Sequence, residues 1–186
     1  MRDHGALYVW WVGEGASDHS MMEEVRKHVE RTFDVPTRVW RGPERPPDSF
    51  DFVRRQHSST AVLRWLVRLR LPGADKVLAI TDVDLFIPIL TFVFGEAQLD
   101  GIAAVVSIAR LARNADGSRA DRRLLTARLA KESAHELGHT FGLLHCDDRR
   151  CVMARSATLL HVDTKSGELC QDCRLHLNDL LRTPRR

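Results

Sequence analysis

The sequence predicts an α/β fold with a mostly parallel β-sheet. Short apolar runs alternate with longer segments of helical periodicity in the order strand, helix, strand, helix, strand, an order typical of α/β layering. The chain has 186 residues, of which 44% are hydrophobic, enough for one domain with a single substantial core. We therefore expect one domain over residues 1–186, with the sheet and most helices in residues 1–142 and a smaller C-terminal part in residues 143–186.

The N-terminal half supplies most of the alternating elements. Ser17 offers an N-cap for the first helix, and Ser58 or Ser59 offers one for the second. Proline and glycine are concentrated in residues 41–49, which predicts an exposed loop. In chain order, the predictions are a strand over 7–12, a helix over 17–31, a strand over 37–40, a helix from 58 or 59 to 70 and a strand over 76–81.

The second half is predicted to contain two short strands and two helices. The strands are expected over residues 91–94 and 102–107, which are rich in β-branched and aromatic residues. A helix is expected over residues 118–141, and another over residues 171–180, where leucines are spaced to dock on the body of the protein.

The predicted helix over 118–141 carries a histidine pattern that indicates a metal site. The chain reads His-Glu-Leu-Gly-His-Thr-Phe-Gly-Leu-Leu-His from His135 to His145, which is HExxHxxGxxH. On a helix, His135 and His139 lie one turn apart and can bind one ion. His145 would point about 240° away on a straight helix, so the chain must leave the helix. Gly142 permits this exit because glycine readily adopts the left-handed conformation.

Three neutral imidazoles would leave one position of a tetrahedral zinc ion open for water, as in catalytic zinc sites. Glu136, next to the first histidine, can then serve as the general base that takes a proton from water and passes it to a leaving amine. The pattern predicts a zinc hydrolase.

All four cysteines follow residue 145 and form two short-spaced pairs. Cys146 and Cys151 make the first pair, and Cys170 and Cys173 make the second, an arrangement that suits a closed, structural zinc site with four thiolate ligands. A redox pair at Cys170 and Cys173, or two disulfides, are the alternatives. Because Cys146 directly follows His145, a zinc ion bound to Cys146 would also fix the third histidine.

These residues, with Met153 after the second cysteine, resemble the archaemetzincins, a branch of the metzincin metallopeptidases. That family couples HExxHxxGxxH to Cx4CxM and a later CxxC. The resemblance implies a mixed, mostly parallel, twisted five-stranded sheet with an antiparallel edge strand, backing helices, a zinc-binding active-site helix and a small four-cysteine zinc subdomain at the C-terminus. Residues 91–94 would be this edge strand and pair with an extended peptide; an ordinary buried strand is the alternative.

The resemblance also implies residue roles and cofactors. His135, His139 and His145 would hold a catalytic zinc ion, Glu136 would be the general base, and Met153 would form the Met-turn, although it could equally be a core methionine. The four cysteines would hold a second, structural zinc ion. The expected function is a zinc-dependent metallopeptidase that acts on peptides or unfolded polypeptides.

Composition and charge limit the other functions. The net charge is only +3, so we do not expect nucleic acid as a partner, and we expect the arginines at 119, 122, 123, 128, 182, 185 and 186 to be solvated. No apolar run is long enough to span a membrane or act as a signal peptide, so we expect a cytoplasmic monomer. The alternative function is a non-enzymatic, zinc-ribbon-like module in which Arg149, Arg150 and Arg155 help to bind nucleic acid or a partner protein.

Four other polar residues are not expected to bind metal. Asp82 and Asp84 follow a predicted strand and could bind a cation or steer substrate amines, but a polar turn is the favoured interpretation. His161 and His176 match no ligand spacing and are expected at the surface.

Overall fold

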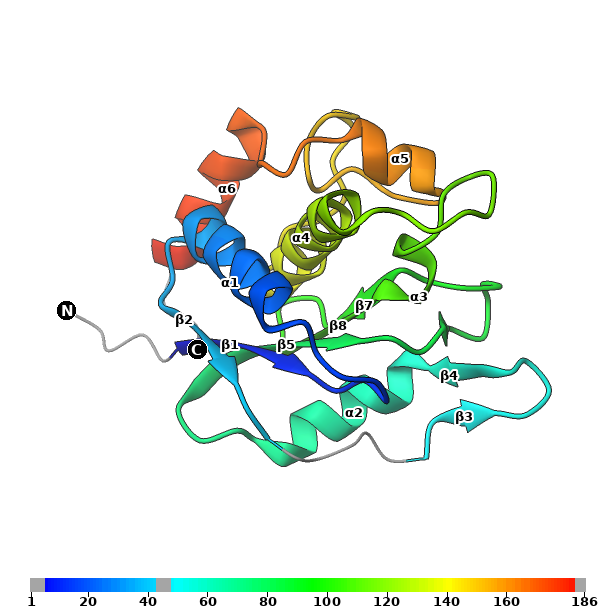
Figure 1. The fold of residues 1–186 in the computed structure, drawn as a ribbon. Helices are drawn as coiled ribbons and strands as arrows, with labels where there is room; N and C mark the ends of the chain where they lie inside the picture. The colour runs from blue at the N-terminus through cyan, green and yellow to red at the C-terminus, as the bar shows by residue number, and fades with distance from the viewer. Residues whose placement is uncertain (1–5, 43–47, 183–186) are drawn as a thin grey trace.

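A five-stranded sheet forms the centre of the structure (Figure 1). The computed structural model describes residues 6–42 and 48–182, so most of the predicted loop over 41–49, together with Arg185 and Arg186, lies outside the described residues. Three strand pairs are parallel and the last pair, β8 with β7, is antiparallel, which confirms the predicted mixed sheet. In spatial order the strands are β2 (Thr37–Trp40), β1 (Ala6–Trp11), β5 (Ala74–Thr81), β8 (Ala103–Ser107) and β7 (Gly95–Ala97).

A second, small sheet was not predicted. It contains β3 (Phe50–Asp51), β4 (Gln56–Ser58) and β6 (Leu85–Phe86). These strands have two or three residues each, too few for a periodic pattern to be visible in the sequence.

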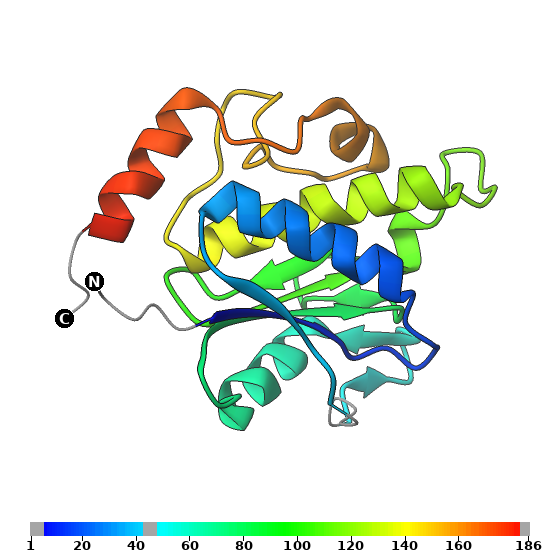
Figure 2. The same cartoon turned by 60° about the vertical axis from the view of Figure 1, so that its left-hand side comes forward.

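Helices cover both faces of the large sheet (Figure 2). Helices α1 (His19–Phe33) and α4 (Arg122–Thr140) lie on one face, and α2 (Ser59–Leu69) lies on the other. Each face has its own apolar cluster, because the strands between them are buried on both sides. Helix α4 is therefore held between the sheet, α1 and the C-terminal segment that contains α5 (Leu159–Thr164).

The helix starts follow capping chemistry, with two shifts from prediction. Ser58 caps α2 as predicted, but Asp18 rather than Ser17 caps α1, since its carboxylate accepts hydrogen bonds from the backbone N–H groups of Ser20 and Met21. Helix α4 begins after the cap Asp121, later than residue 118. The preceding residues instead form a turn, in which Asp116 accepts a hydrogen bond from Ser118, and they follow the short helix α3 (Ile108–Leu111).

The antiparallel edge strand exists, but its predicted position at residues 91–94 is wrong. The strand that pairs with β8 is β7, with Gly95 opposite Val106. The last backbone hydrogen bond of this pairing runs from the N–H of Ser107 to the carbonyl of Phe94. Pairing does not continue through residues 91–93, because β8 ends at Ser107, whose side chain caps α3. Phe94 is instead buried in the core.

The C-terminal part packs over α4. Helix α5 (Leu159–Thr164) lies beside α4, and α6 (Gln171–Arg182) confirms the helix predicted over 171–180. Arg128 corrects the expectation of a solvated arginine face, because it is buried and makes a bidentate pair with Asp163, with two N···O distances of 2.7 Å. Among the described residues, no helix has the length and apolar character needed to cross a membrane.

Candidate active site

The structure brings His135, His139 and His145 together at the C-terminal end of α4. Each ring offers one ligand-capable nitrogen atom, and these three atoms lie within 4.8 Å of one another. His135 and His139 lie on successive turns of the helix, and the chain leaves the helix at Gly142, whose φ of 102° is in the left-handed region. This exit returns His145 to the other two rings, as the motif predicted. These residues are called the three-histidine cluster below.

Hydrogen bonds fix which nitrogen each helical histidine presents. Nδ1 of His135 lies 2.8 Å from the carbonyl oxygen of Val152, and Nδ1 of His139 lies 2.8 Å from that of Leu143. A carbonyl oxygen only accepts, so both Nδ1 atoms must carry the proton, and both Nε2 atoms present lone pairs.

The donor set fits a zinc ion. The two Nε2 atoms lie 3.2 Å apart, and two lone pairs at this separation repel each other unless a cation lies between them. Zinc–nitrogen bonds of about 2.0–2.1 Å at a tetrahedral angle would place two such nitrogens about 3.3 Å apart. The exposure rises from His135, which is buried, through His139 to His145, which is exposed, so the cluster opens to solvent on the His145 side.

Glu136 lies in a space beside the edge strand β7. Its side chain is 7% exposed and packs against Gly95, the first residue of that strand. A Cβ atom at position 95 would lie 2.7 Å from Cγ of Glu136 and 2.7 Å from the carbonyl oxygen of Val105. Only glycine leaves room for the carboxylate there, a requirement that the sequence motif did not reveal.

Burial shifts the pKa values of the site in directions that suit hydrolysis. It raises the pKa of Glu136 well above its ordinary value, and the nearby negative charge of Glu132 raises it further. Burial also lowers the pKa of His135 strongly, and those of His139 and His145 to a lesser degree. Neutral imidazoles are the form that a metal ion binds.

Met153 lies beneath the helix. It is fully buried, and a Cβ atom at Gly138 would fall on its Sδ atom. The absence of a side chain at Gly138 therefore lets the thioether approach the backbone of α4 between the two helical histidines.

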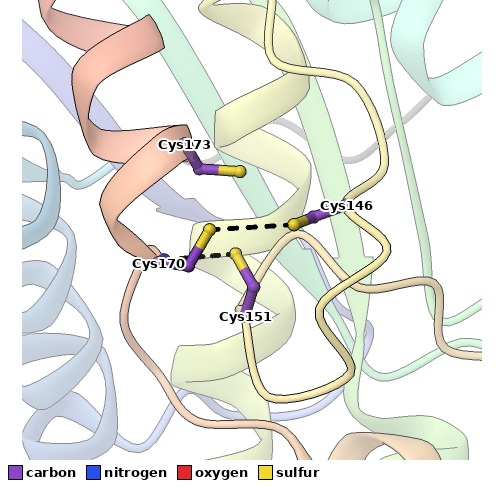
Figure 3. Close-up of side chains that lie close together, drawn as sticks. All are labelled: Cys146, Cys151, Cys170 and Cys173. Carbon is purple, nitrogen blue, oxygen red and sulfur yellow. Dashed lines mark hydrogen bonds between the residues drawn. The ribbon is translucent and has the colours of Figure 1, made fainter.

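The four cysteines form a second cluster, the four-cysteine cluster (Figure 3). Cys146 and Cys151 come from the loop after α4, whereas Cys170 directly precedes α6 and Cys173 lies in its first turn. All four are free, and their sulfur atoms lie within 4.8 Å of one another. The sulfurs of Cys146 and Cys170 are 3.7 Å apart, close to the roughly 3.8 Å that zinc–sulfur bonds of about 2.3 Å give at a tetrahedral angle.

Backbone groups support this cluster and connect it to the histidines. Sγ of Cys151 accepts hydrogen bonds from the backbone N–H groups of Met153 and Cys170. The N–H of Cys146 donates to the carbonyl of Met153, and Cys146 pairs with Ala154 in an isolated β-bridge. Cys146 also follows His145 directly, so one short segment carries a predicted metal ligand of each cluster. The same segment is hydrogen-bonded to the backbone of Met153.

The cysteine pKa values shift in both directions. Burial raises the pKa values of Cys173 and Cys146, whereas the backbone N–H of Cys173 lowers the pKa of Cys170. The thiol of Cys170 is thus the most readily ionised of these three.

The remaining polar candidates are structural or exposed. Asp82 accepts hydrogen bonds from the backbone N–H groups of Glu14 and Gly15, and Asp84 pairs with Arg110. His161 and His176 are exposed, as expected.

Comparisons with known proteins agree with this geometry. Residues 20–179 match Peptidase family M54. The chain is 40% identical to the archaemetzincin of Methanopyrus kandleri over 154 residues, which cover 83% of this chain and 84% of the relative. It is also 40% identical to the archaemetzincin of Methanocaldococcus jannaschii, covering 72% and 73% of the two chains.

The chain is a member of the archaemetzincins, peptidase family M54. The crystal structure of the Methanopyrus kandleri archaemetzincin superposes with a TM-score of 0.85 at 37% identity and covers 97% of both chains. A zinc-dependent peptidase from Methanocorpusculum labreanum gives a TM-score of 0.82 at 30% identity, covering 92% of this chain and all of that one. The family resemblance and the predicted enzyme class, a zinc metallopeptidase, are thereby confirmed.

Archaemetzincin membership also accounts for both clusters as candidate metal sites. It favours the peptidase over the alternative of a non-enzymatic binding module, which leaves the three-histidine cluster and the buried Glu136 without a purpose.

Proposed function

We propose that the chain hydrolyses peptide bonds at the three-histidine cluster, with Glu136 as general base. The observation that carries this proposal is the pair of Nε2 lone pairs 3.2 Å apart on α4, on which Glu136, the residue after His135, is buried. His135, His139 and His145 would hold a catalytic zinc ion. When bound, zinc would polarise the substrate carbonyl and lower the pKa of water in the site.

Glu136 is suited to move the proton. Burial and the nearby charge of Glu132 raise its pKa above that of an ordinary carboxyl group, which increases its tendency to take up a proton, as a general base must. Glu136 would take a proton from the attacking water and deliver it to the amine that leaves as the peptide bond breaks. The absence of a side chain at Gly95 leaves room for the Glu136 side chain beside the edge strand, which supports this role.

The edge strand β7 offers a place for the substrate backbone. An extended peptide can add to the exposed edge of a sheet through main-chain hydrogen bonds, and β7 is the last strand on its side. We infer that peptides or unfolded segments bind there, since a folded domain seldom offers a free extended strand.

The four-cysteine cluster would hold a second, structural zinc ion. Four thiolates form a closed coordination shell, so this site would have no position for substrate. Its connection to His145 through Cys146, and to Met153 through the Cys146 N–H, supports a role in holding the third histidine in place.

Glu136→Gln tests the proposed base, because glutamine keeps the size of the side chain and cannot accept the proton. We expect unchanged zinc content and at least a 100-fold loss of cleavage of a fluorogenic peptide library. Glu23→Gln, on the surface of α1, is the matched control and should keep full activity. Undiminished cleavage by Glu136→Gln would refute the assignment of the base.

A further inference from the structure

A buried ion pair lies behind the three-histidine cluster. The ammonium Nζ of Lys165 lies 2.7 Å from Oε1 of Glu132, and the two side chains are only 1% and 2% exposed. Glu132 lies on α4 one turn before Glu136, and Lys165 follows the end of α5. The sequence motif contains neither residue.

Lys165 contacts the turn around Met153 as well as Glu132. Its Nζ atom donates to the carbonyl oxygens of Val152 at 3.1 Å and Ala154 at 3.4 Å, the two carbonyl groups that flank Met153. The carbonyl of Val152 is also the acceptor for Nδ1 of His135. One carbonyl oxygen therefore receives hydrogen bonds from both Lys165 and a predicted metal ligand.

Glu132 completes the arrangement. Its Oε1 atom also accepts a hydrogen bond from Ser156 Oγ, at 3.2 Å, so the carboxylate contacts the segment that follows Met153. The Lys165–Glu132 pair thus joins α4, the residues 152–156 and the segment after α5.

Stability alone does not explain such a pair. Removing both charges from water is costly, and apolar residues of similar volume often stabilise a core equally well or better. The pair can instead orient a neighbouring group. Nζ of Lys165 can hold the Val152 carbonyl oxygen in the position where it accepts the hydrogen bond from Nδ1 of His135. Outer partners of this kind orient metal-ligating histidines, and their loss commonly costs 10- to 100-fold in metal affinity.

We propose that Lys165 and Glu132 are positioning residues for the metal site: they fix the Val152 carbonyl, and through it the ring of His135. This inference rests on the proposed function, in which His135 binds zinc. Neither residue touches the substrate or the reacting atoms.

The chain contains a matched control. Arg128 and Asp163 form another ion pair with two N···O distances of 2.7 Å, and it joins the same helix α4 to α5. The other contacts of Arg128 are the carbonyls of Leu111 and Arg113, so it reaches neither His135 nor residues 152–154 through the hydrogen bonds described. Removing one partner of either pair should destabilise the fold, but only a change in the Lys165–Glu132 pair should affect metal binding.

The test uses the full chain loaded with Co²⁺ in place of zinc. A thiolate site gives intense charge-transfer bands in the near ultraviolet that a three-imidazole site lacks, so these bands follow the four-cysteine cluster. Once they are saturated, further change in the visible bands follows Co²⁺ binding at the histidines. Lys165→Met should weaken Co²⁺ binding at the histidines 10- to 100-fold and alter the visible bands, with the thiolate bands unchanged. Arg128→Met should lower the Tm and leave both sets of bands and both affinities unchanged.

Lys165→Met leaves the buried Glu132 carboxylate without its ion-pair partner, a change that can prevent folding. The double variant Lys165→Met/Glu132→Leu removes both charges and keeps the inference testable. It should fold. Its affinity for Co²⁺ at the histidines should be at least 10-fold lower than that of the wild type, because the Val152 carbonyl has lost the hydrogen bond from Lys165.

Three results would overturn the inference. The first is a double variant that folds and binds Co²⁺ at the histidines with wild-type affinity. The second is a loss of affinity in Arg128→Met as large as that in Lys165→Met. The third is that none of the variants changes the visible bands of the histidine site. If the wild-type chain itself binds no metal at the histidines, the proposed function fails, and this result is distinct from a failure of the positioning role alone.

Discussion

Gly95 leaves the space that the Glu136 side chain occupies: a Cβ atom at position 95 would lie 2.7 Å from Cγ of Glu136. The two residues are far apart in the sequence, and pairing of the edge strand with β8 brings them together. The position of the proposed base thus depends on the sheet as well as on the zinc motif.

Gly95→Ala should therefore impair catalysis more than metal binding. The added methyl group meets both Glu136 and the backbone oxygen of Val105, and neither the carboxylate nor β7 can keep its place. Displacement of a catalytic group by about 1 Å can lower the rate about 100-fold. We expect a loss of kcat of this order with normal zinc content. Gly117→Ala is a control that leaves the site untouched: Gly117 has a φ of 82°, so alanine should lower the Tm, but no other atom lies within 4 Å of an added Cβ and activity should stay normal. Equal activity of the Gly95 and Gly117 variants would contradict the account.

Gly138→Ala should disturb the packing of Met153 against α4, next to the helical histidines. The new methyl group would fall on the Met153 thioether, which is fully buried and has little room to move. Overpacking of this kind typically costs about 1–3 kcal/mol. We expect a lower Tm and weaker zinc retention at the histidines, measured by competition with a chelator. Adding Met153→Ala should relieve part of the loss, and no relief would argue against the contact.

Cys146→Ser tests the connection between the clusters. It removes a proposed ligand of the structural zinc ion from the residue that follows His145, so the segment carrying His145 loses its anchor. We expect zinc to fall below one ion per chain, with reduced occupancy of both sites. A variant that keeps one zinc ion and full activity would show that the sites are independent.

Asp18 caps α1 and also pairs with Arg122 near the start of α4. Asp18→Ala should lower the free energy of unfolding by about 1 kcal/mol, and Asp18→Asn, which preserves the cap, should recover most of it. Chemical denaturation of the three proteins at pH 7 measures both effects.

The charge of Asp18 should make the free energy of unfolding depend on pH in a known direction. The hydrogen bond with Arg122 lowers the pKa of the carboxyl group in the folded state. Its contribution is therefore fully present above the unfolded pKa of about 3.9 and is lost as the pH falls towards the folded value. The pair is exposed, so the difference between wild type and Asp18→Asn should stay below about 1 kcal/mol and shrink below about pH 4. A difference that grows on acidification would contradict this explanation.

The sequence predicted those features that depend on local geometry. The i, i+4 histidines, the glycine exit and the short-spaced cysteines lie close along the chain, so helix periodicity and turn chemistry suffice to bring most of each cluster together. The alternation of strands and helices similarly predicted the parallel part of the sheet.

Features that depend on distant partners were missed. The start of β7 depends on where its partner β8 ends. The edge strand therefore lies at Gly95–Ala97 and not at the predicted residues 91–94. Arg128 was expected at the surface because its partner Asp163 lies on another helix, and Lys165 has no local signal that links it to Glu132. A buried charge cannot be recognised in a sequence until its partner is known.

The most direct test of the central claim is the zinc content per chain, measured together with peptide cleavage, in the wild-type chain and in His139→Ala. The account predicts two zinc ions and cleavage for the wild type, and one zinc ion with no cleavage for His139→Ala. A wild-type chain that cleaves peptides without zinc at the histidines, or a His139→Ala variant that keeps two zinc ions and full cleavage, would contradict it.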